Sequence, residues 1–573
     1  MHPSPPLRVP VGHDAQRWST FHARRTLVVA ARTVTSTARV LESLPALLRD
    51  DTRVAVVFAY DPTSAFDNGV LELLHDSGCR VMPWRQLSEI DPDLIVSASE
   101  NIDVPQGDCP VLVLPHGIGF QKFVPDSRAE RSRLSGVVPD SLLEAGRAWL
   151  AVSHPDQEAQ LLASHPKTAG RTLLVGDPCL DELVVSTRHR DAYREALGVG
   201  AGQRLVMVSS TWGRTSLIGR EPGLPARLLA ALPYDEYRVG AIIHPNVWSA
   251  HGPWQVRTAQ ATALDAGLLL MPPVHSWRPA LVAADVVIGD HGSVTLYGAA
   301  LDKPVLLAAF GSDAVPGTAG ADLARIAPRL DPAGDLRRQV EDAVHGHVPQ
   351  RYAEVSGRAF SDPGQALTRL RTALYQLLQL PEPPSRPPAA LTLLPPEPPS
   401  AAVTSWRVTT AVSEGAGRPV VTAHRFPAAV CDDWAEGPGP YVHLACTDEE
   451  RDPRLAESAS VVVRARPAVT AAAALDWIQD SLTRLPGSRL AATGVHEAGA
   501  GTGWLIGLRD GRVVEAAATG PSLDAGLLAA AVYGRLRAGH PLDDTRVTLR
   551  VGGLRDTDVR LRPHSARTSA SAD

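Results

Sequence analysis

The sequence predicts an α/β protein with two doubly wound halves that face a common cleft, followed by a smaller α+β domain. Three observations support this prediction. Apolar segments of strand length alternate with helix-like segments over residues 21–380, which is typical of parallel sheets covered by helices on both faces. A proline-rich run, residues 381–400, interrupts the alternation. Beyond that run, strand-like segments outnumber helix-like ones.

In the first half, short apolar runs of buried-strand length are separated by helix-like segments. Gly78 closes one of these helices, as glycine commonly does. The predicted strands are Thr26–Ala31, Arg53–Ala59, Asp93–Ala98, Pro110–Leu114 and Trp149–Ser153, and the predicted helices are Thr37–Leu48, Gly69–Ser77 and Asp156–Ala163.

The second half repeats the alternation. Its predicted strands are Arg171–Val175, Arg204–Ser209, Arg238–Ile243, Gly267–Met271, Asp285–Ile288 and Val305–Ala309. We expect the last helix, Ala366–Leu380, to cross back to the first half. Two Rossmann-like halves of this kind leave a cleft between the carboxyl ends of their strands, where ligands are expected.

The expected organisation has six segments. They are a disordered N-terminus (1–20), an N-terminal half on the acceptor side (21–165), a C-terminal half that binds the nucleotide donor (166–380), a semi-rigid linker (381–400), an α+β accessory domain (401–563) and a disordered tail (564–573). The accessory domain carries no catalytic motif, so a protein partner could be recruited through it.

Composition excludes several classes of protein. A net charge of −6 and a pI near 6.3 argue against a non-specific nucleic-acid binder. The 5 cysteines are scattered and form no CxxC pair, which fits a reducing cytoplasm. No apolar run is long enough to span a membrane, and the N-terminus has no signal-peptide core. We therefore expect a cytoplasmic protein, with peripheral contact at the inner membrane face left open.

The segment Gly289–Ser293, GDHGS, has the pattern of an anion-binding turn. It follows a predicted strand and opens into the predicted helix Val294–Leu301. The first turn of such a helix has unpaired N–H groups and a partial positive charge. Gly292 would let the backbone approach a phosphate, and Ser293 and Thr295 could add hydroxyl donors. An ordinary strand–helix connection is the alternative reading.

Three further polar segments follow predicted strands. Histidine side chains as a class change charge close to working pH, so a histidine such as His116, in LPHGIGFQK, suits a general base. Thr211 and Arg214, in SSTWGRTS, could contact phosphate oxygens. His244, in IIHPNVW, stands at the rim because Pro245 stops the strand. Each of them, taken alone, could equally be a polar loop residue.

The order of these segments resembles the CDP-glycerol glycerophosphotransferase family, the teichoic-acid polymerases with a GT-B fold. That family has HGTPLK, GYPRND, PTWR, HPN and DYSS in series, followed by a DKPI-like segment. This chain has HGIGFQK, GDPCLD, STWGR, HPN, DHGS and DKPV in the same order. The resemblance covers roughly residues 20–380.

The resemblance implies a role for each matching residue. His116 would take the proton from the acceptor hydroxyl, and His244 would contact the donor phosphates. Donor contacts are implied for Thr211, Arg214, Asp290, His291, Gly292, Ser293 and Thr295. The donor would be CDP-glycerol or a nucleotide-sugar, and the acceptor a hydroxyl compound such as a cell-wall polymer. The family needs no cofactor and no bound metal.

Departures from the motifs keep alternatives open. DYSS has become DHGS, so one hydroxyl is lost and His291 replaces an aromatic residue. A catalytically silent binding or scaffold protein is one alternative, and an enzyme resembling UDP-GlcNAc 2-epimerase is another. A metal enzyme that uses His244, His275 and His291 is disfavoured, because these residues lack ligand spacing.

Overall fold

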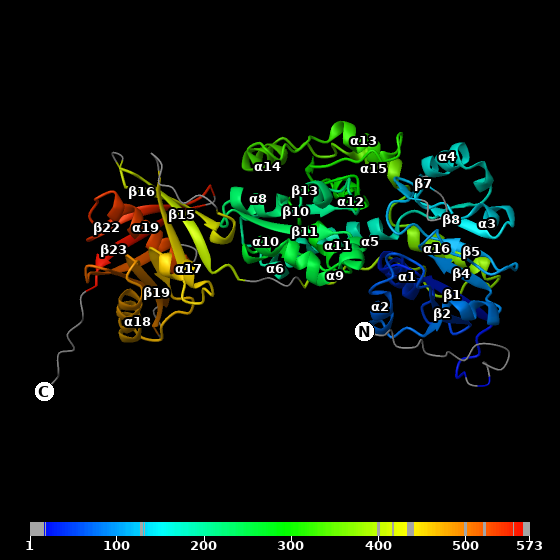
Figure 1. Cartoon of the computed structure of the whole chain (residues 1–573), viewed down its shortest axis with the longest axis horizontal. Coiled ribbons are helices and arrows are strands. Elements are labelled where there is room, and N and C mark those ends of the chain that lie inside the picture. The colour runs from blue at the N-terminus through cyan, green and yellow to red at the C-terminus, as the bar shows by residue number, and fades with distance from the viewer. Residues whose placement is uncertain are drawn as a thin grey trace.

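The structure is a computed structural model that describes residues 17, 19–125, 130, 132–397, 402–414, 417–431, 440–497, 501–519, 523–553 and 555–564. The disorder expected for residues 1–20 and 564–573 falls outside these residues, except for 17, 19, 20 and 564. Three bodies follow one another along the long axis of the molecule (Figure 1). The second α/β half lies between the first half and the C-terminal domain.

The first sheet is parallel, with strand order β3-β2-β1-β4-β5-β8-β9. Side chains that alternate along β1 enter the hydrophobic clusters on the two faces: Leu27 and Val29 on one, Val28 and Ala30 on the other. Both faces are covered, as predicted. The strands are β1 (Arg25–Ala31), β2 (Val54–Tyr60), β3 (Val81–Pro83), β4 (Leu94–Ser97), β5 (Val111–Val113), β8 (Ala148–Val152) and β9 (Thr172–Leu174).

Because β9 pairs with β8, the expected boundary after residue 165 falls inside the first sheet. The same body carries the short hairpin β6 (Phe123–Pro125) and β7 (Ser132–Leu134). Its helices are α1 (Val34–Leu47), α2 (Val70–Asp76), α3 (Asp140–Glu144) and α4 (Pro155–Ser164).

The second sheet is also parallel, with strand order β12-β11-β10-β13-β14. Its strands are β10 (Arg204–Ser210), β11 (Tyr237–Ile243), β12 (Leu269–Leu270), β13 (Val286–Gly289) and β14 (Val305–Leu307). Its helices are α5 (Pro178–Ser186), α6 (Arg190–Ala196), α7 (Leu217–Arg220), α8 (Leu224–Ala231), α9 (Pro245–Ala259), α10 (Ala261–Asp265), α11 (Trp277–Ala283), α12 (Ser293–Ala300), α13 (Ala319–Ile326), α14 (Leu336–His345) and α15 (Ala353–Ala359).

The last helix of the α/β region, α16 (Ala366–Leu377), crosses back to the first half. Leu370 and Leu374 pack in the cluster that contains Leu27, and the Tyr375 hydroxyl donates to Asp51 Oδ2 at 2.6 Å. This crossing confirms the sequence prediction. The α/β region is therefore two parallel sheets joined by a final helix that returns to the first.

The linker has no regular secondary structure over residues 381–397. Its first part is bonded to α16, where Arg371 contacts Glu382 and donates to the Arg386 carbonyl, and its later part lies against the second half. The Tyr193 hydroxyl donates to the Leu393 carbonyl at 2.7 Å, and the Leu393 amide donates to Ser186 Oγ at 2.9 Å. These two bonds fix the end of the linker before the C-terminal domain begins.

The C-terminal domain is a closed barrel of mixed parallel and antiparallel pairs, a more specific architecture than the predicted α+β. Helix α19 (Ala525–Arg537) packs in its core, and its residues Ala525–Arg535 are all buried. The other helices are α17 (Pro453–Ser458) and α18 (Ala471–Arg484). The strands are β15 (Ser405–Ser413), β16 (Val420–Pro427), β17 (Tyr441–Thr447), β18 (Val461–Val463), β19 (Leu490–Glu497), β20 (Gly501–Leu508), β21 (Val513–Thr519), β22 (Thr545–Val551) and β23 (Arg555–Pro563).

Sequence reasoning missed three barrel strands, β16, β19 and β23. In β23, RDTDVRLRP, charged residues interrupt the apolar positions, and only every second residue in the middle of the strand is buried. One face of such a strand is exposed to solvent, so the strand contains few apolar residues.

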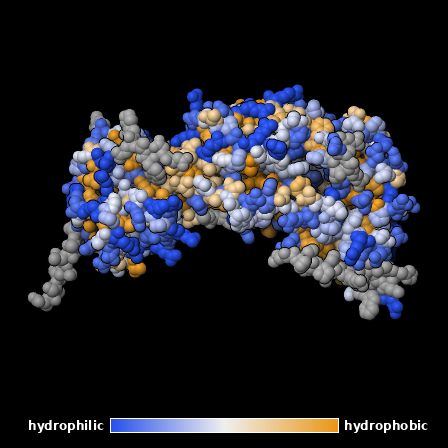
Figure 2. Space-filling model, in the orientation of Figure 1, coloured by the Kyte–Doolittle hydropathy of each residue, from blue (hydrophilic) through white to orange (hydrophobic). Residues whose placement is uncertain are grey.

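The barrel is joined to the second half by a buried arginine. Arg425 donates to both oxygens of Asp235, at 2.9 and 2.6 Å, and also lies 2.8 Å from Asp524. Hydrophobic residues show between the polar ones where the barrel meets the middle body, while most of the visible face is polar (Figure 2). Within the part of the chain that the structure describes, no helix has the length and apolar character needed to cross a membrane.

Candidate functional site

A cavity of about 570 Å³ lies between the two α/β halves. The loops that line it follow the carboxyl ends of β1, β2, β4 and β5 in the first sheet, and of β10, β11, β12 and β13 in the second. In each sheet the strand order reverses at one point, between β1 and β4 and between β10 and β13. Ligands bind at such points in open α/β sheets.

His116 lines the cavity from the loop after β5. Its Nδ1 lies 3.1 Å from the Ala98 carbonyl oxygen. A carbonyl can only accept, so Nδ1 carries the proton and Nε2 is left with a free lone pair. This tautomer can accept a proton from a substrate.

His244 lines the opposite wall and is the N-cap of α9. Its Nδ1 accepts a hydrogen bond from the Asn246 amide at 3.1 Å, so in the neutral ring Nε2 carries the proton. Burial lowers the pKa of His244 to about 3, and the nearby charges of His116 and Lys122 act in the same direction. His244 is therefore a neutral hydrogen-bond donor, the opposite tautomer to His116.

Asp290 holds the turn before α12 together from inside. One carboxylate oxygen accepts from the Thr211 amide at 2.9 Å and the Leu217 amide at 2.8 Å, and the other accepts from the Gly292 amide at 2.9 Å. Burial raises the pKa of Asp290, although His291 and these amides oppose the shift. Asp290 does not line the cavity, whereas Thr211 and Gly292, which it fixes, do.

Both ring nitrogens of His291 also contact other protein groups. Its Nδ1 accepts from the Gly311 amide at 3.1 Å, and its Nε2 lies 3.2 Å from Asp313 Oδ2. Asp313 is paired in turn with Lys122 at 3.1 Å, and the Lys122 ammonium lies over the Trp212 ring. The first half thereby contacts the second at the edge of the cavity.

The remaining predicted site residues differ in position. Ser293 lines the cavity, but its hydroxyl accepts a hydrogen bond from the Ile118 amide at 3.1 Å. Thr295 is fully buried against Gly289 and does not line the cavity. Arg214 is exposed and does not line it either. The structure thus gathers His116, Thr211, His244, His291, Gly292 and Ser293 around one cavity.

Sequence reasoning missed several charged residues of the N-terminal wall, namely Arg39, Glu42, Glu100 and Arg133. Arg133 Nη1 lies 2.9 Å from Glu100 Oε1. Burial alone would raise the pKa of Glu100, but the charges of Arg133 and His116 outweigh it, and the net shift is downward. These residues follow no motif, because they come from a helix interior, a loop and a hairpin.

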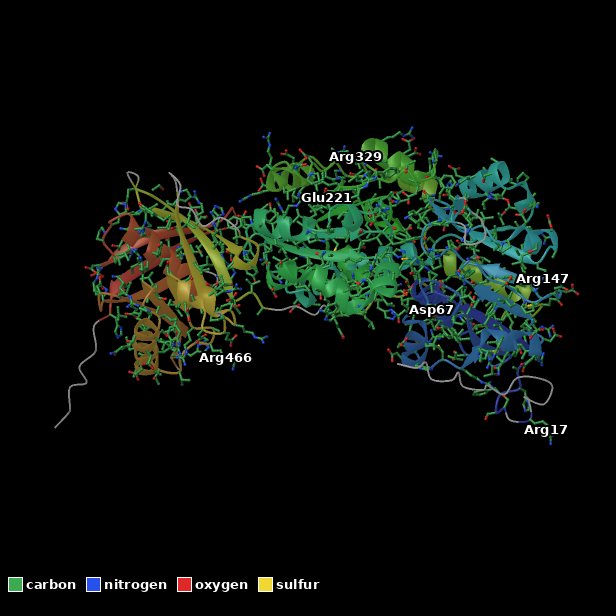
Figure 3. The ribbon with its side chains drawn as sticks, in the orientation of Figure 1. Arg17, Asp67, Arg147, Glu221, Arg329 and Arg466 are labelled. Atoms are coloured by element: carbon green, nitrogen blue, oxygen red, sulfur yellow. The ribbon has the colours of Figure 1, made fainter. Side chains whose placement is uncertain are left out.

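Aromatic and polar contacts join the two halves beside the cavity. Phe66 of the first half meets Trp212 of the second edge to face, with 5.2 Å between the ring centroids. Next to it, the Ser249 hydroxyl donates to the Asn68 carbonyl at 3.0 Å. Figure 3 shows the neighbouring Asp67 on the side of the first half that faces the second sheet. Among the described residues, no cluster of three or more His, Cys, Asp or Glu side chains is arranged to hold a metal ion.

No family model matches the chain. A copalyl diphosphate synthase of Streptomyces cyslabdanicus is 31% identical over 225 residues, which are 35% of this chain and 40% of that protein. The chain thus spans about two fifths of the length of this curated relative. So partial a match does not establish a shared activity.

Two solved structures with a partly similar course of the chain are a polymerase and an epimerase. The wall teichoic acid polymerase TagF matches 62% of this chain and 89% of its own, with 12% identity and a TM-score of 0.44. The UDP-GlcNAc 2-epimerase of Neisseria meningitidis bound to UDP-GlcNAc matches 62% of this chain and 100% of its own, with 13% identity and a TM-score of 0.40. At these scores neither structure bears on the activity of this chain.

Proposed function

We propose that the chain is a nucleotide-activated transferase that moves glycerophosphate, from a CDP-glycerol-like donor, or a sugar to an acceptor hydroxyl. The observation that carries the proposal is the pair of opposite histidine tautomers. His116 offers a lone pair to the cavity and His244 offers an N–H, and both line the same space. A transferase needs one group to accept a proton and another to meet negative charge.

The reaction balances with these two groups. The acceptor O–H bond breaks as His116 Nε2 takes the proton, and the oxygen attacks the donor. With a CDP-glycerol-like donor the attack is on the phosphorus next to glycerol, and CMP leaves as the P–O–P link breaks. With a nucleotide-sugar the attack is on the anomeric carbon, and the nucleoside diphosphate leaves as the C–O bond breaks. Each new phosphate charge is met by His244.

Backbone groups complete the donor side of the proposal. Asp290 fixes the Thr211 and Gly292 segments, so little reorganisation is needed when charge develops. The scheme assigns charge stabilisation to protein groups instead of a metal or a cofactor. Turnover that is lost on chelation and restored by a divalent cation would contradict this part.

The test is product formation from CDP-glycerol, and separately from UDP-sugars, with a panel of hydroxyl acceptors. His116→Ala is expected to lower kcat by about 10²–10⁴, the usual contribution of a general base, with donor affinity unchanged. His154→Ala is a matched control, because His154 caps α4 and does not line the cavity. Unchanged turnover in His116→Ala would exclude this residue as the base.

Binding without turnover is the second candidate. It is favoured by Ser293, whose hydroxyl is already bonded to Ile118, and by Arg214 and Thr295, which lie outside the cavity lining. A chain that binds nucleotides but releases no product from any donor would fit this candidate. The acceptor panel also tests the proposed cell-wall acceptor, whereas a protein partner bound by the barrel is a separate proposal.

A further inference from the structure

We propose that the N-terminal half holds a second anion site, built by Arg39 and the first turn of α1, which binds a phosphate or carboxylate group of the acceptor. This inference rests on the proposed transferase function, because it assigns the opposite wall of the same cavity. The site lies at the reversal point of the first sheet, where β1 and β4 are neighbours.

Arg39 has unused donors that open into the cavity. The residue is only 7% exposed, yet it lines the cavity. Within the described part of the chain it makes one ion pair, with 3.5 Å between its Nη1 and Glu42 Oε2, and no hydrogen bond. None of its nitrogens is among the buried atoms that lack a partner, so these nitrogens remain accessible from the cavity.

The start of α1 adds backbone donors to the same wall of the cavity. Thr33 and Ser36 form a capping box, in which each side chain accepts from the other residue's amide. The amides of Val34 and Thr35, the first two residues of the helix, have no intrahelical acceptor. The first turn contains no acidic residue that would compete with an anion. Thr33 and Thr35 both line the cavity.

The charges around Arg39 leave it available to a ligand. Glu42 is shared with Arg278, which lies 2.8 Å from Glu42 Oε1 and also pairs with Glu182. Burial raises the pKa of Glu182 to about 7, against the opposing charge of Arg278. Asp177 is another carboxylate whose charge acts on Arg39. It is the N-cap of α5, so the dipole of that helix offsets its negative charge.

The chemistry of the site selects an oxyanion. A guanidinium presents its N–H groups as a planar fork that matches two oxygens of a phosphate or carboxylate. Arg32 also lines the cavity, but its Nε lies 3.1 Å from Asp61 Oδ2, so its guanidinium is already paired with a carboxylate. His116 lines the same cavity from the loop after β5, so an acceptor anchored at Arg39 would share that space with the base.

The test is calorimetric titration of the full chain with inorganic phosphate, and separately with acetate, while CDP or UDP saturates the donor side. The wild type is expected to bind one oxyanion with nucleotide present, and the stronger of the two probes identifies the source of the charge. Arg39→Gln should weaken that binding about tenfold or more and leave nucleotide affinity unchanged. Arg39→Lys keeps the charge but loses the planar pair of N–H donors, so its oxyanion affinity should lie between those of the wild type and Arg39→Gln.

Arg147→Gln is the matched control. Arg147 is a buried arginine of the same half that donates to the Cys109 and Pro105 carbonyls and lies away from the cavity (Figure 3). The Arg147→Gln variant should bind the oxyanion with the same affinity as the wild type. Oxyanion binding that survives in Arg39→Gln, that nucleotide abolishes, or that the wild type lacks would overturn the site. Arg39-dependent phosphate binding in a chain that binds no nucleotide would instead refute the donor function alone.

Discussion

The cavity has two strand–turn–helix units, β13–α12 on one wall and β1–α1 on the other, and they use their polar groups differently. In the β13–α12 turn, Asp290 accepts hydrogen bonds from three amides and Ser293 accepts one from the Ile118 amide. These two side chains are therefore already hydrogen-bonded to protein groups. In the β1–α1 unit, Arg39 makes no hydrogen bond in the described structure and opens into the cavity. The first wall is organised for rigidity, and the second keeps a charge available.

The largest effect is expected from breaking the rigid wall. Asp290→Ala removes the acceptor of two buried amides and one partly buried amide. A buried amide costs about 1–3 kcal/mol when left unpaired, so the free energy of unfolding should fall by about 3 kcal/mol or more. Asp290→Asn should lose less, because one acceptor oxygen remains. Denaturant unfolding measures both variants.

Asp265→Ala, at the exposed end of α10, is the control for the Asp290 variants and should change stability by less than about 0.5 kcal/mol. An Asp290→Ala variant as stable as this control would show that the wall does not depend on its carboxylate.

The next effect concerns pH and His244. Its folded pKa, about 3, lies below the ordinary value of 6.5, so on acidification the unfolded chain takes up a proton before the folded chain does. The contribution of His244 to stability is thus complete above pH 6.5 and is lost as pH falls toward 3. The slope is at most about 1.4 kcal/mol per pH unit.

His244→Gln should flatten the stability curve between pH 6.5 and 4, as measured by denaturant midpoints at several pH values. His540→Gln is the control variant, because His540 is in the barrel, is partly exposed and does not line the cavity. Equal slopes in the wild type and His244→Gln would mean that His244 is protonated as readily in the folded chain as in the unfolded one.

A smaller effect is expected at the start of α1. Thr33→Ala removes one half of the capping box and should cost about 1 kcal/mol, the usual value of a helix cap. Thr470→Ala, which removes the cap of α18 in the barrel, should cost a similar amount. Hydrogen exchange should then locate the loosening at α1 in the first variant and at α18 in the second. Loosening at the same place in both would contradict this local role.

The smallest stability effect is expected from Arg39. Its ion pair with Glu42 spans 3.5 Å, and Glu42 keeps Arg278 as a partner, so Arg39→Gln leaves no buried carboxylate unpaired and should cost less stability than Asp290→Ala. Thermal unfolding measures the change. A loss as large as that of Asp290→Ala would mean that Arg39 is part of the rigid wall, and the contrast between the two units would disappear.

Much of this architecture could be predicted from local pattern. Apolar runs and turns located the parallel strands, and the strand ends brought His116 and His244 to one cavity. Charged positions hid strands such as β23, because a strand with one wet face carries few apolar residues. Arg39 gave no signal, since a lone arginine inside a helix reads as a solvent-facing residue.

The sequence by itself determined the alternation of strands and helices and the polar turns at the strand ends, because period and turn residues act over a few positions. Only the tertiary structure decided how each polar group is used. Asp290 is bonded to amides 79 and 73 residues away, and Ser293 to an amide 175 residues away. Such pairings depend on how distant segments pack together. The sequence therefore cannot distinguish a residue that binds an anion from one whose side chain is hydrogen-bonded within the protein.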